Sequence, residues 1–397
     1  MTMKTSARIL QVANQAGPLY LFMLPLCRAL RQSGAEVELA CTPLGALWEP
    51  LNQLDFKVHS LPAGSWSRPS TWWMIYRKMR LLLRTGEFDL MIVCTPAMSW
   101  VARPAARGLV PASIYFAYGL PFAPEQSRLA HIAFRRIEQF MARYTDAVIV
   151  INSDDAAACQ RFKLTRCDGR CYHVPGPGVD VDAFSSRPAE HLITKLEQEL
   201  GLKAGKPMVL FLGRFIRPKR PGDVLELARK IGPEVDFVLA GEGPLWEQIK
   251  KAGARIGPHV KVIEFTDQVR LLLARCSLFV LPSVFREGLP QTLLEAHSAG
   301  KPAVAYDVRG PRDIIEHGTT GYLVQPCNVD ELYEAVRNVL EDDELRMRMG
   351  QAGQKHIREK FSTNAALSAI LPAVCEVLQQ KNICDIQYRG ETGYGTK

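Results

Sequence analysis

The sequence predicts an α/β protein with two doubly wound domains, each built on a parallel sheet. The apolar run at residues 278–281 is typical of a strand buried on both faces, and the mostly apolar segments at 8–13 and 89–94 have strand length. The alternation of strand and helix starts again at Met208, after a connector rich in Pro and Gly at residues 174–180. A chain of 397 residues is long enough for two domains with complete cores.

In the first half, strands are expected at residues 8–13, 37–40, 89–94, 113–117 and 146–150, and the last of these closes the first sheet. Helices are expected at 19–33, 70–84 and 129–144, with Gly34 ending the first one. Residues 14–18, which include Gly17, form the first turn. This β-α-β opening implies a right-handed crossover. The turn lacks the GxGxxG fingerprint, which argues against a nicotinamide or flavin cofactor.

In the second half, strands are expected at 208–212, 236–240, 260–265 and 278–281, and helices at 222–231, 290–300, 330–340, 344–361 and 367–380. The expected domains are residues 1–182 and 183–364, followed by a last helical segment at 365–380. Residues 381–397 show no periodicity, so we expect a mobile tail.

Composition indicates a soluble cytoplasmic protein. The apolar fraction of 47% and the charged fraction of 23% are ordinary values for a globular chain. No apolar run reaches the roughly 20 residues that span a bilayer, and no cleavable signal pattern is present. Ten scattered cysteines indicate reduced thiols. Cys167, Cys171 and His173 lie close in sequence, but without a second ligand pair they predict no metal site.

The formal charge of +8 is uneven along the chain. Residues 1–185 hold 20 Lys/Arg against 14 Asp/Glu, a net charge of +6, so the first half is expected to meet an anionic partner. The basic residues are not interleaved with a known base-recognition motif, so a nucleic-acid partner is not predicted.

The most informative stretch is residues 282–300, which predicts strand end, loop and helix. Pro290 suits the first position of a helix, which needs no amide hydrogen. Glu287 precedes the helix and Glu295 lies inside it. The amides that open the helix would form an anion site between these carboxylates: Gly288, Leu289, Gln291 and Thr292. A surface glutamate and an ordinary helix acid also fit the loop when it is taken alone.

The segment from Glu287 to Glu295 resembles the two-glutamate motif of family 4 retaining glycosyltransferases, which have the GT-B fold. The resemblance extends through residues 303–324. It implies two Rossmann-like domains that face each other across a cleft, with the C-terminal helix crossing back to the first domain. It also implies a nucleotide-diphosphate sugar as substrate, with no cofactor and no metal ion. Asp180 and Asp182 form a DxD triplet in the connector, and the resemblance gives it no metal role.

The resemblance assigns further donor-site residues. Arg214 and Lys219 follow the strand at 208–212 and would neutralise a diphosphate, although a solvated basic loop is the alternative. Gly241 and Gly243 would border the nucleotide, because glycine lets the backbone approach a ligand. Residues that would contact the donor from the helix start and from the first domain are Gly288, Leu289, Pro290, Thr292, Glu295 and Gly17.

Tyr118 stands at a strand end where the resembled family often carries a histidine that touches the donor sugar. A phenol can hydrogen-bond a sugar hydroxyl, but it does not titrate near neutral pH. A contact between Tyr118 and the acceptor or sugar is therefore expected without the acid-base behaviour of a histidine.

The helix at residues 70–84 combines aromatic and cationic residues, and no acid occurs between Ser65 and Glu87. Two interpretations stay open: contact with an anionic membrane surface, or a helix packed on the sheet with solvated arginines. The residues that would contact the membrane are Trp72, Trp73, Arg77, Lys78, Arg80 and Arg84.

Together these features predict a metal-independent, retaining hexosyl- or N-acetylhexosaminyl-type transferase that uses a UDP-linked sugar, with Arg214, Lys219 and Glu287 in catalysis. The acceptor would be lipid-linked or saccharide, in the synthesis of bacterial cell-surface polysaccharide at the inner face of the cytoplasmic membrane. A sugar-nucleotide epimerase, a transferase to a small soluble acceptor and a non-catalytic sugar-nucleotide-binding scaffold remain alternatives. The sequence leaves the oligomeric state open.

Overall fold

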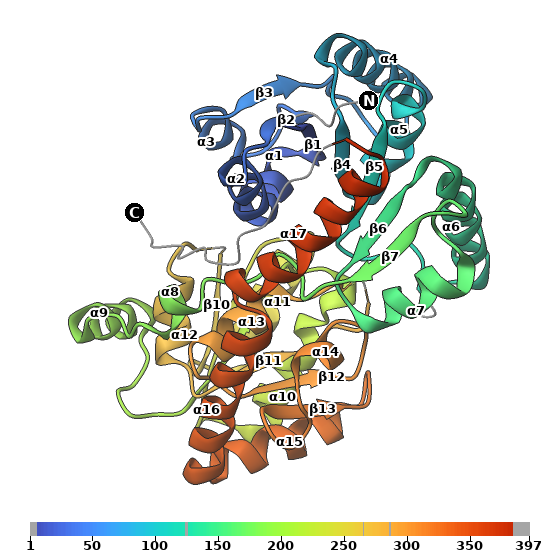
Figure 1. Ribbon diagram of the computed structural model, residues 1–397. Coiled ribbons are helices and arrows are strands. Elements are labelled where there is room, and N and C mark those ends of the chain that lie inside the picture. The colour runs from blue at the N-terminus through green and yellow to red at the C-terminus, as the bar shows by residue number, and fades with distance from the viewer. Residues whose placement is uncertain (1–5, 124–125, 265, 286, 384–397) are drawn as a thin grey trace. The chain divides into compact units, whose positions relative to one another are not determined.

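The computed structural model describes residues 6–123, 126–264, 266–285 and 287–383. The chain forms two compact units (Figure 1): unit 1 comprises Met1–Gly178 and Thr363–Lys397, and unit 2 comprises Val179–Ser362. The chain passes from one unit to the other between residues 178 and 179 and again between residues 362 and 363. The boundaries predicted from the sequence were 182/183 and 364/365. Most of the tail predicted at 381–397 lies outside the described residues.

In its described part, unit 1 contains one sheet of seven parallel strands in the order β3-β2-β1-β4-β5-β6-β7. The strands are β1 (Arg8–Gln15), β2 (Glu36–Thr42), β3 (Lys57–Ser60), β4 (Leu90–Cys94), β5 (Ala112–Ala117), β6 (Ala147–Val150) and β7 (Arg170–His173). The helical segments are α1 (Ala16–Pro18), the π-helical turn η1 (Leu19–Met23), α2 (Leu24–Gln32), α3 (Trp48–Asn52), α4 (Pro69–Gly86), α5 (Pro96–Ala106), α6 (Arg128–Met141), the 3-10 turn η2 (Ala142–Tyr144), α7 (Ser153–Phe162) and α17 (Thr363–Gln380).

Two predictions for unit 1 were wrong. The segment 146–150 does not close the sheet, because β7 pairs beyond β6 and β3 forms the opposite edge. Both edge strands are half exposed and polar, so they lack the apolar run that marks a central strand. Residues 14–18 are not a turn either: β1 continues to Gln15 and the helix starts at Ala16. Pro18 is compatible with a first helical turn, where an amide hydrogen is not needed.

One core cluster of unit 1 joins α4, α5 and α7 to one face of the sheet, with α6 packing on it through Phe134. Ile75 and Met79 of α4 and Met98 of α5 are fully buried there, so one face of α4 packs on the sheet. The last helix, α17, follows unit 2 in sequence but belongs to unit 1, where it packs against α2.

In its described part, unit 2 contains a parallel sheet of six strands in the order β10-β9-β8-β11-β12-β13. The strands are β8 (Met208–Leu212), β9 (Asp236–Ala240), β10 (Val260–Ile263), β11 (Leu278–Leu281), β12 (Ala303–Tyr306) and β13 (Gly321–Val324). The helices are α8 (Val181–Ser185), α9 (Glu190–Leu200), the 3-10 turn η3 (Arg217–Lys219), α10 (Pro221–Ile231), α11 (Trp246–Ile256), α12 (Val269–Arg275), α13 (Gln291–Ser298), α14 (Pro311–Ile314), α15 (Val329–Glu341) and α16 (Asp343–Lys360).

The sheet of unit 2 is buried on both faces. Alternate residues of β8 enter different core clusters: Leu210 lies in one and Phe211 in the other. The strand order runs outward from β8 in both directions, so the order reverses between β8 and β11. In doubly wound folds this reversal is the topological switch point, where ligands bind at the carboxyl ends of the strands.

The described helices include none that is long and apolar enough to span a membrane. The nine cysteines among the described residues are free thiols, and seven of them are at least partly buried.

Candidate active site

The candidate site lies in unit 2, in the loops that follow β8 and β11 at the switch point. Val284 donates a backbone hydrogen bond to the carbonyl of Pro218, with an N···O distance of 2.9 Å. This bond ties the loop after β11 to the 3-10 turn after β8. Two segments that are far apart in sequence are therefore held together before any ligand arrives.

Lys219 and Glu287 form an ion pair across these two loops. The carboxylate side chain is 6% exposed and the lysine side chain 20% exposed. A buried carboxylate needs a counter-charge, and here the lysine supplies it. The structure thus brings together one predicted cation and one predicted acid.

The Glu287 loop is also supported by the segment after β12. Arg309 donates from Nε to the carbonyl of Glu287 at 3.0 Å. Gly310 has a φ of 93°, and a Cβ there would lie 2.8 Å from the carbonyl oxygen of Gly288. Only glycine fits this approach. Sequence reasoning placed residues 303–324 in the family pattern but gave Arg309 and Gly310 no role; the Gly-Pro pair at residues 310 and 311 was the available signal.

Helix α13 starts one residue later than predicted. Pro290 is the N-cap residue with extended backbone (φ −68°, ψ 111°), and its side chain makes no capping hydrogen bond. The amides of Leu293 and Leu294 donate to the carbonyl of Pro290, at 3.0 and 3.3 Å. Gln291 and Thr292 therefore open the helix at its positive end, where a helix favours an anion.

Glu295 lies further along α13 and keeps part of its surface exposed. Desolvation by the surrounding protein raises the pKa of its carboxyl to about 8. His297 of the same helix is fully buried, and desolvation lowers its pKa to about 4. Burial is the largest cause of both pKa shifts.

Arg214, Gly241 and Gly243 lie on the loops after β8 and β9. The side chain of Arg214 is exposed and makes no hydrogen bond or ion pair within the described part of the chain. A Cβ on Gly241 would lie 1.9 Å from the carbonyl oxygen of Gly213, and one on Gly243 would lie 2.7 Å from that of Phe215. These glycines are thus required by the packing of the two loops on each other, a reason that the sequence interpretation did not include.

The two remaining donor or acceptor candidates lie in unit 1. Tyr118 donates from its hydroxyl to the Met23 sulfur at 2.8 Å, and burial raises its pKa well above the usual range. Its ring lies 5.3 Å from that of Phe22. Gly17 is in the short helix α1, and a Cβ there would meet no atom within 4 Å.

The DxD carboxylates of the connector have local structural partners. Asp180 caps α8 by accepting from the amide of Ala183 at 3.0 Å. Asp182 pairs with Arg358 of α16 at 2.7 Å. No cluster of three or more metal-ligating side chains occurs among the described residues.

Most of the predicted membrane residues of α4 are exposed, but not all. Trp73 is 59% exposed, and Arg77, Lys78 and Arg84 also reach solvent. Arg80 instead donates to the carbonyls of Ala105 and Arg107, at 3.3 and 3.4 Å, at the C-terminal end of α5. Trp72 is partly buried among aromatic rings.

Comparisons with known proteins cover both units. Residues 22–167 match the family model described as "Glycosyl transferase 4-like domain", and residues 193–356 match the one described as "Glycosyl transferases group 1". The chain is 33% identical over 323 residues to the alpha-D-kanosaminyltransferase of Streptomyces kanamyceticus, which covers 76% of this chain and 81% of that protein.

A second relative is the UDP-Gal:alpha-D-GlcNAc-diphosphoundecaprenol alpha-1,3-galactosyltransferase of Escherichia coli, 25% identical over 275 residues, with 67% of this chain and 70% of that protein covered. Among solved structures, HepE of Anabaena with UDP and glucose has a TM-score of 0.79 at 19% identity, and covers 93% of this chain and 100% of that one. Both units therefore have the Rossmann-like architecture of the GT-B fold. With both family models matched in order along the chain, this protein belongs to the family 4 type of GT-B glycosyltransferases.

Proposed function

We propose that the protein transfers a sugar from a nucleotide-diphosphate sugar, with retention at the anomeric carbon. The observation that carries the proposal is the Lys219–Glu287 pair at the switch point, beside the start of α13. A cation, a helix N-terminus and a carboxylate at one strand edge suit a diphosphate that is joined to a sugar.

Charge on the leaving diphosphate grows as the bond to the anomeric carbon breaks. Lys219 and Arg214 would stabilise that charge, together with the amides of Gln291 and Thr292. Glu287 is oriented by Lys219 and by the support of Arg309, and would accept hydrogen bonds from sugar hydroxyls. The ion pair with Glu287 thus holds the Lys219 side chain in place before the donor arrives.

Glu295 would bind the ribose hydroxyls of the donor. A carboxyl whose pKa is about 8 is largely protonated at neutral pH. Hydroxyls that donate to the carboxylate would favour its ionised form and lower that pKa.

For the transfer step we favour attack of the acceptor hydroxyl on the face that the phosphate leaves, with the departing phosphate taking the proton. A double displacement with Glu287 as nucleophile is the alternative. The ammonium of Lys219 withdraws charge from that carboxylate, which favours the first route. A glycosyl adduct trapped on Glu287 in a single turnover would support the second.

The acceptor is proposed to be lipid-linked or saccharide, in cell-surface polysaccharide synthesis. The basic first unit and the name of the Escherichia coli relative, which acts on a diphosphoundecaprenol-linked acceptor, support a phosphorylated lipid carrier. A peripheral position at the inner face of the cytoplasmic membrane would follow. Vesicle flotation of a variant in which Arg77, Lys78 and Arg84 are replaced by Gln tests the electrostatic part; Arg80 is kept because it supports α5.

The deciding experiment is a donor screen across UDP-, GDP- and ADP-linked hexoses and N-acetylhexosamines, with and without a polyprenyl-diphosphate acceptor and with chelator present. We expect turnover of a UDP-sugar, an α-linked product and no loss of rate with chelator. An epimerised nucleotide sugar as product would support the epimerase alternative. Tight donor binding without turnover of any donor would support the scaffold alternative.

A further inference from the structure

The positive charge of the chain is concentrated in one segment of unit 1. Residues 65–145 contain 11 Lys/Arg and 4 Asp/Glu, a net charge of 11 − 4 = +7, against +8 for the whole chain. Asp89 and Glu138 are buried, at 5% and 1% exposure, and Glu125 lies outside the described residues. Glu87 is the one exposed acid in the described part of the segment.

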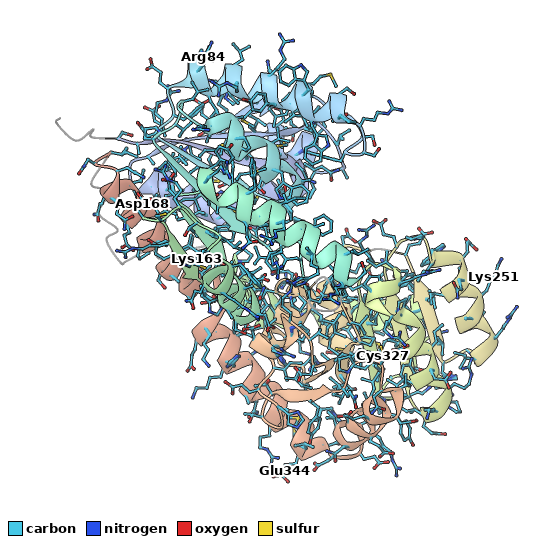
Figure 2. All side chains as sticks on the ribbon, turned by 90° about the vertical axis from the view of Figure 1, so that its right-hand side faces the viewer. Arg84, Lys163, Asp168, Lys251, Cys327 and Glu344 are labelled. Carbon is cyan, nitrogen blue, oxygen red and sulfur yellow. The ribbon has the colours of Figure 1, made fainter. Side chains whose placement is uncertain are left out.

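The three helices of this segment lie side by side on the same core cluster. The ring of Trp72 in α4 stacks on that of Trp100 in α5, with centroids 6.1 Å apart, and Trp100 stacks on Phe134 of α6 at 5.8 Å. Figure 2 shows α4, with Arg84 labelled, and α6 on the side of unit 1 turned toward the viewer. The outer faces of α4 and α6 therefore belong to one surface.

An aromatic groove of about 430 Å³ opens between α4 and α5, lined by Pro69, Trp72, Trp73, Tyr76, Trp100 and Val101. The indole N–H of Trp72 donates to the carbonyl of Trp66, and that of Trp100 donates to Glu138, both at 2.7 Å. The groove consequently offers apolar rings and few free donors. Such walls suit a hydrocarbon chain, whereas a sugar would lose the hydrogen bonds of its hydroxyls.

Helix α6 carries a second exposed apolar face. Leu129 is 82% exposed, and Ile132 and Phe140 also reach solvent. Arg136 of α6 and Arg143 of the adjoining turn η2 fall on the same face by their spacing, and the guanidinium of Arg143 lies 4.1 Å from the ring centre of Phe140. An exposed helix face on which apolar and cationic side chains alternate is typical of helices that lie in a membrane interface.

We propose that α4 and α6 together form one docking surface for an anionic phospholipid bilayer, and that the Trp72–Trp100 groove takes a lipid hydrocarbon chain. The proposal deepens the membrane part of the proposed function by adding α6 and the groove. A net charge of +7 complements anionic head groups, and tryptophan and tyrosine favour the boundary between head groups and chains. A second copy of the chain would present the same charge and be repelled.

The test is co-sedimentation of the full chain with vesicles of phosphatidylcholine alone or with about a third phosphatidylglycerol. We expect binding to the anionic vesicles only, weakened by salt. Replacing Arg136 and Arg143 by Gln should weaken binding about 30-fold, because each arginine near the surface contributes roughly fivefold. The matched control replaces Lys251 and Arg255 of α11, which are equally charged and exposed, and should bind as the wild type does.

Groove occupancy has its own readout, quenching of tryptophan fluorescence by lipids brominated in the chain. Wild type should be quenched, and Trp73→Ala should bind anionic vesicles several-fold more weakly. Three outcomes would overturn the proposed docking surface: wild-type protein that stays in the supernatant, Arg136 and Arg143 variants that bind like the wild type, or self-association of the chain through this surface. Bound protein without quenching would overturn the groove. Donor hydrolysis without vesicles should be unchanged in the Arg136 and Arg143 variants, so failure here is distinguishable from failure of the proposed function.

Discussion

At the scale of single residues, the Lys219–Glu287 pair determines the electrostatics of the site. Lys219→Met would leave a carboxylate of 6% side-chain exposure without its cation. We expect the free energy of unfolding to fall by about 2–3 kcal/mol, near the low end for buried pairs because the lysine is partly exposed. The turnover number should fall by about 10²- to 10³-fold through loss of charge stabilisation. Urea unfolding and steady-state kinetics measure the two effects.

A second variant separates the two effects. In Lys219→Met/Glu287→Leu the buried charge is gone, so most of the lost stability should return while activity stays low. Lys230→Met is the control, since that lysine pairs with Asp330 at the surface and should change neither quantity by much. Normal turnover in Lys219→Met would contradict the role given to the pair.

Glu295 makes stability depend on pH in a defined window. Its pKa rises from 4.5 to about 8 on folding, so between these values the unfolded chain has lost a proton that the folded chain keeps. The free energy of unfolding should therefore fall as pH rises from about 4.5 to about 8, and Glu295→Gln should remove that contribution. Urea unfolding of both proteins at several pH values checks this. Parallel curves for the two proteins would contradict it.

At the scale of elements, Gly310 couples the segment before α14 to the Glu287 loop. A methyl group there would approach the Gly288 carbonyl to 2.8 Å, so Gly310→Ala should displace the loop and reduce activity about tenfold or more. Gly318→Ala is the matched control: it also has a positive φ, of 77°, but a Cβ meets no atom within 4 Å. The free energy of unfolding of both variants should fall by about 1–3 kcal/mol, because a side chain at positive φ strains the backbone. Equal activity in both would contradict the coupling.

The central elements could be predicted from sequence because their patterns are strong. Strands β8 and β11 are continuous apolar runs, and α4 shows a clear helical period. The edge strands β3 and β7 are short and half exposed, so burial does not mark them in the sequence. Their positions follow from pairing with the neighbouring strands, which the sequence does not encode locally.

The sequence predicted the part of the site that depends on where the central strands end. Both loops follow the carboxyl ends of strands in one parallel sheet, so Lys219 and Glu287 lie at the same sheet edge. The support by Arg309, the packing demand on Gly241 and the desolvation around Glu295 depend on three-dimensional contacts between loops. Spacing along one chain gives no information on such contacts.

At the scale of the whole molecule, the two units have separate cores, and α17 stabilises the unit that precedes it in sequence by more than 180 residues. Leu371 of α17 and Leu332 of α15 are both buried, at 1% and 0% exposure. Each Leu→Ala change should lower the free energy of unfolding by about 3 kcal/mol. We expect Leu371→Ala to speed hydrogen exchange in peptides of unit 1, and Leu332→Ala to speed it in peptides of unit 2.

UDP then reports which unit holds the donor. At about 100 times its dissociation constant it should add about 2.7 kcal/mol to the stability of the unit that binds it. Because the proposed diphosphate contacts come from unit 2, UDP should slow exchange in unit 2 and offset most of the effect of Leu332→Ala. In unit 1, where Leu371→Ala speeds exchange, UDP should slow exchange less than it does in unit 2. Slower exchange in unit 1 alone would place the diphosphate site in unit 1 instead of unit 2. It would remove the basis for the roles of Lys219 and Glu287.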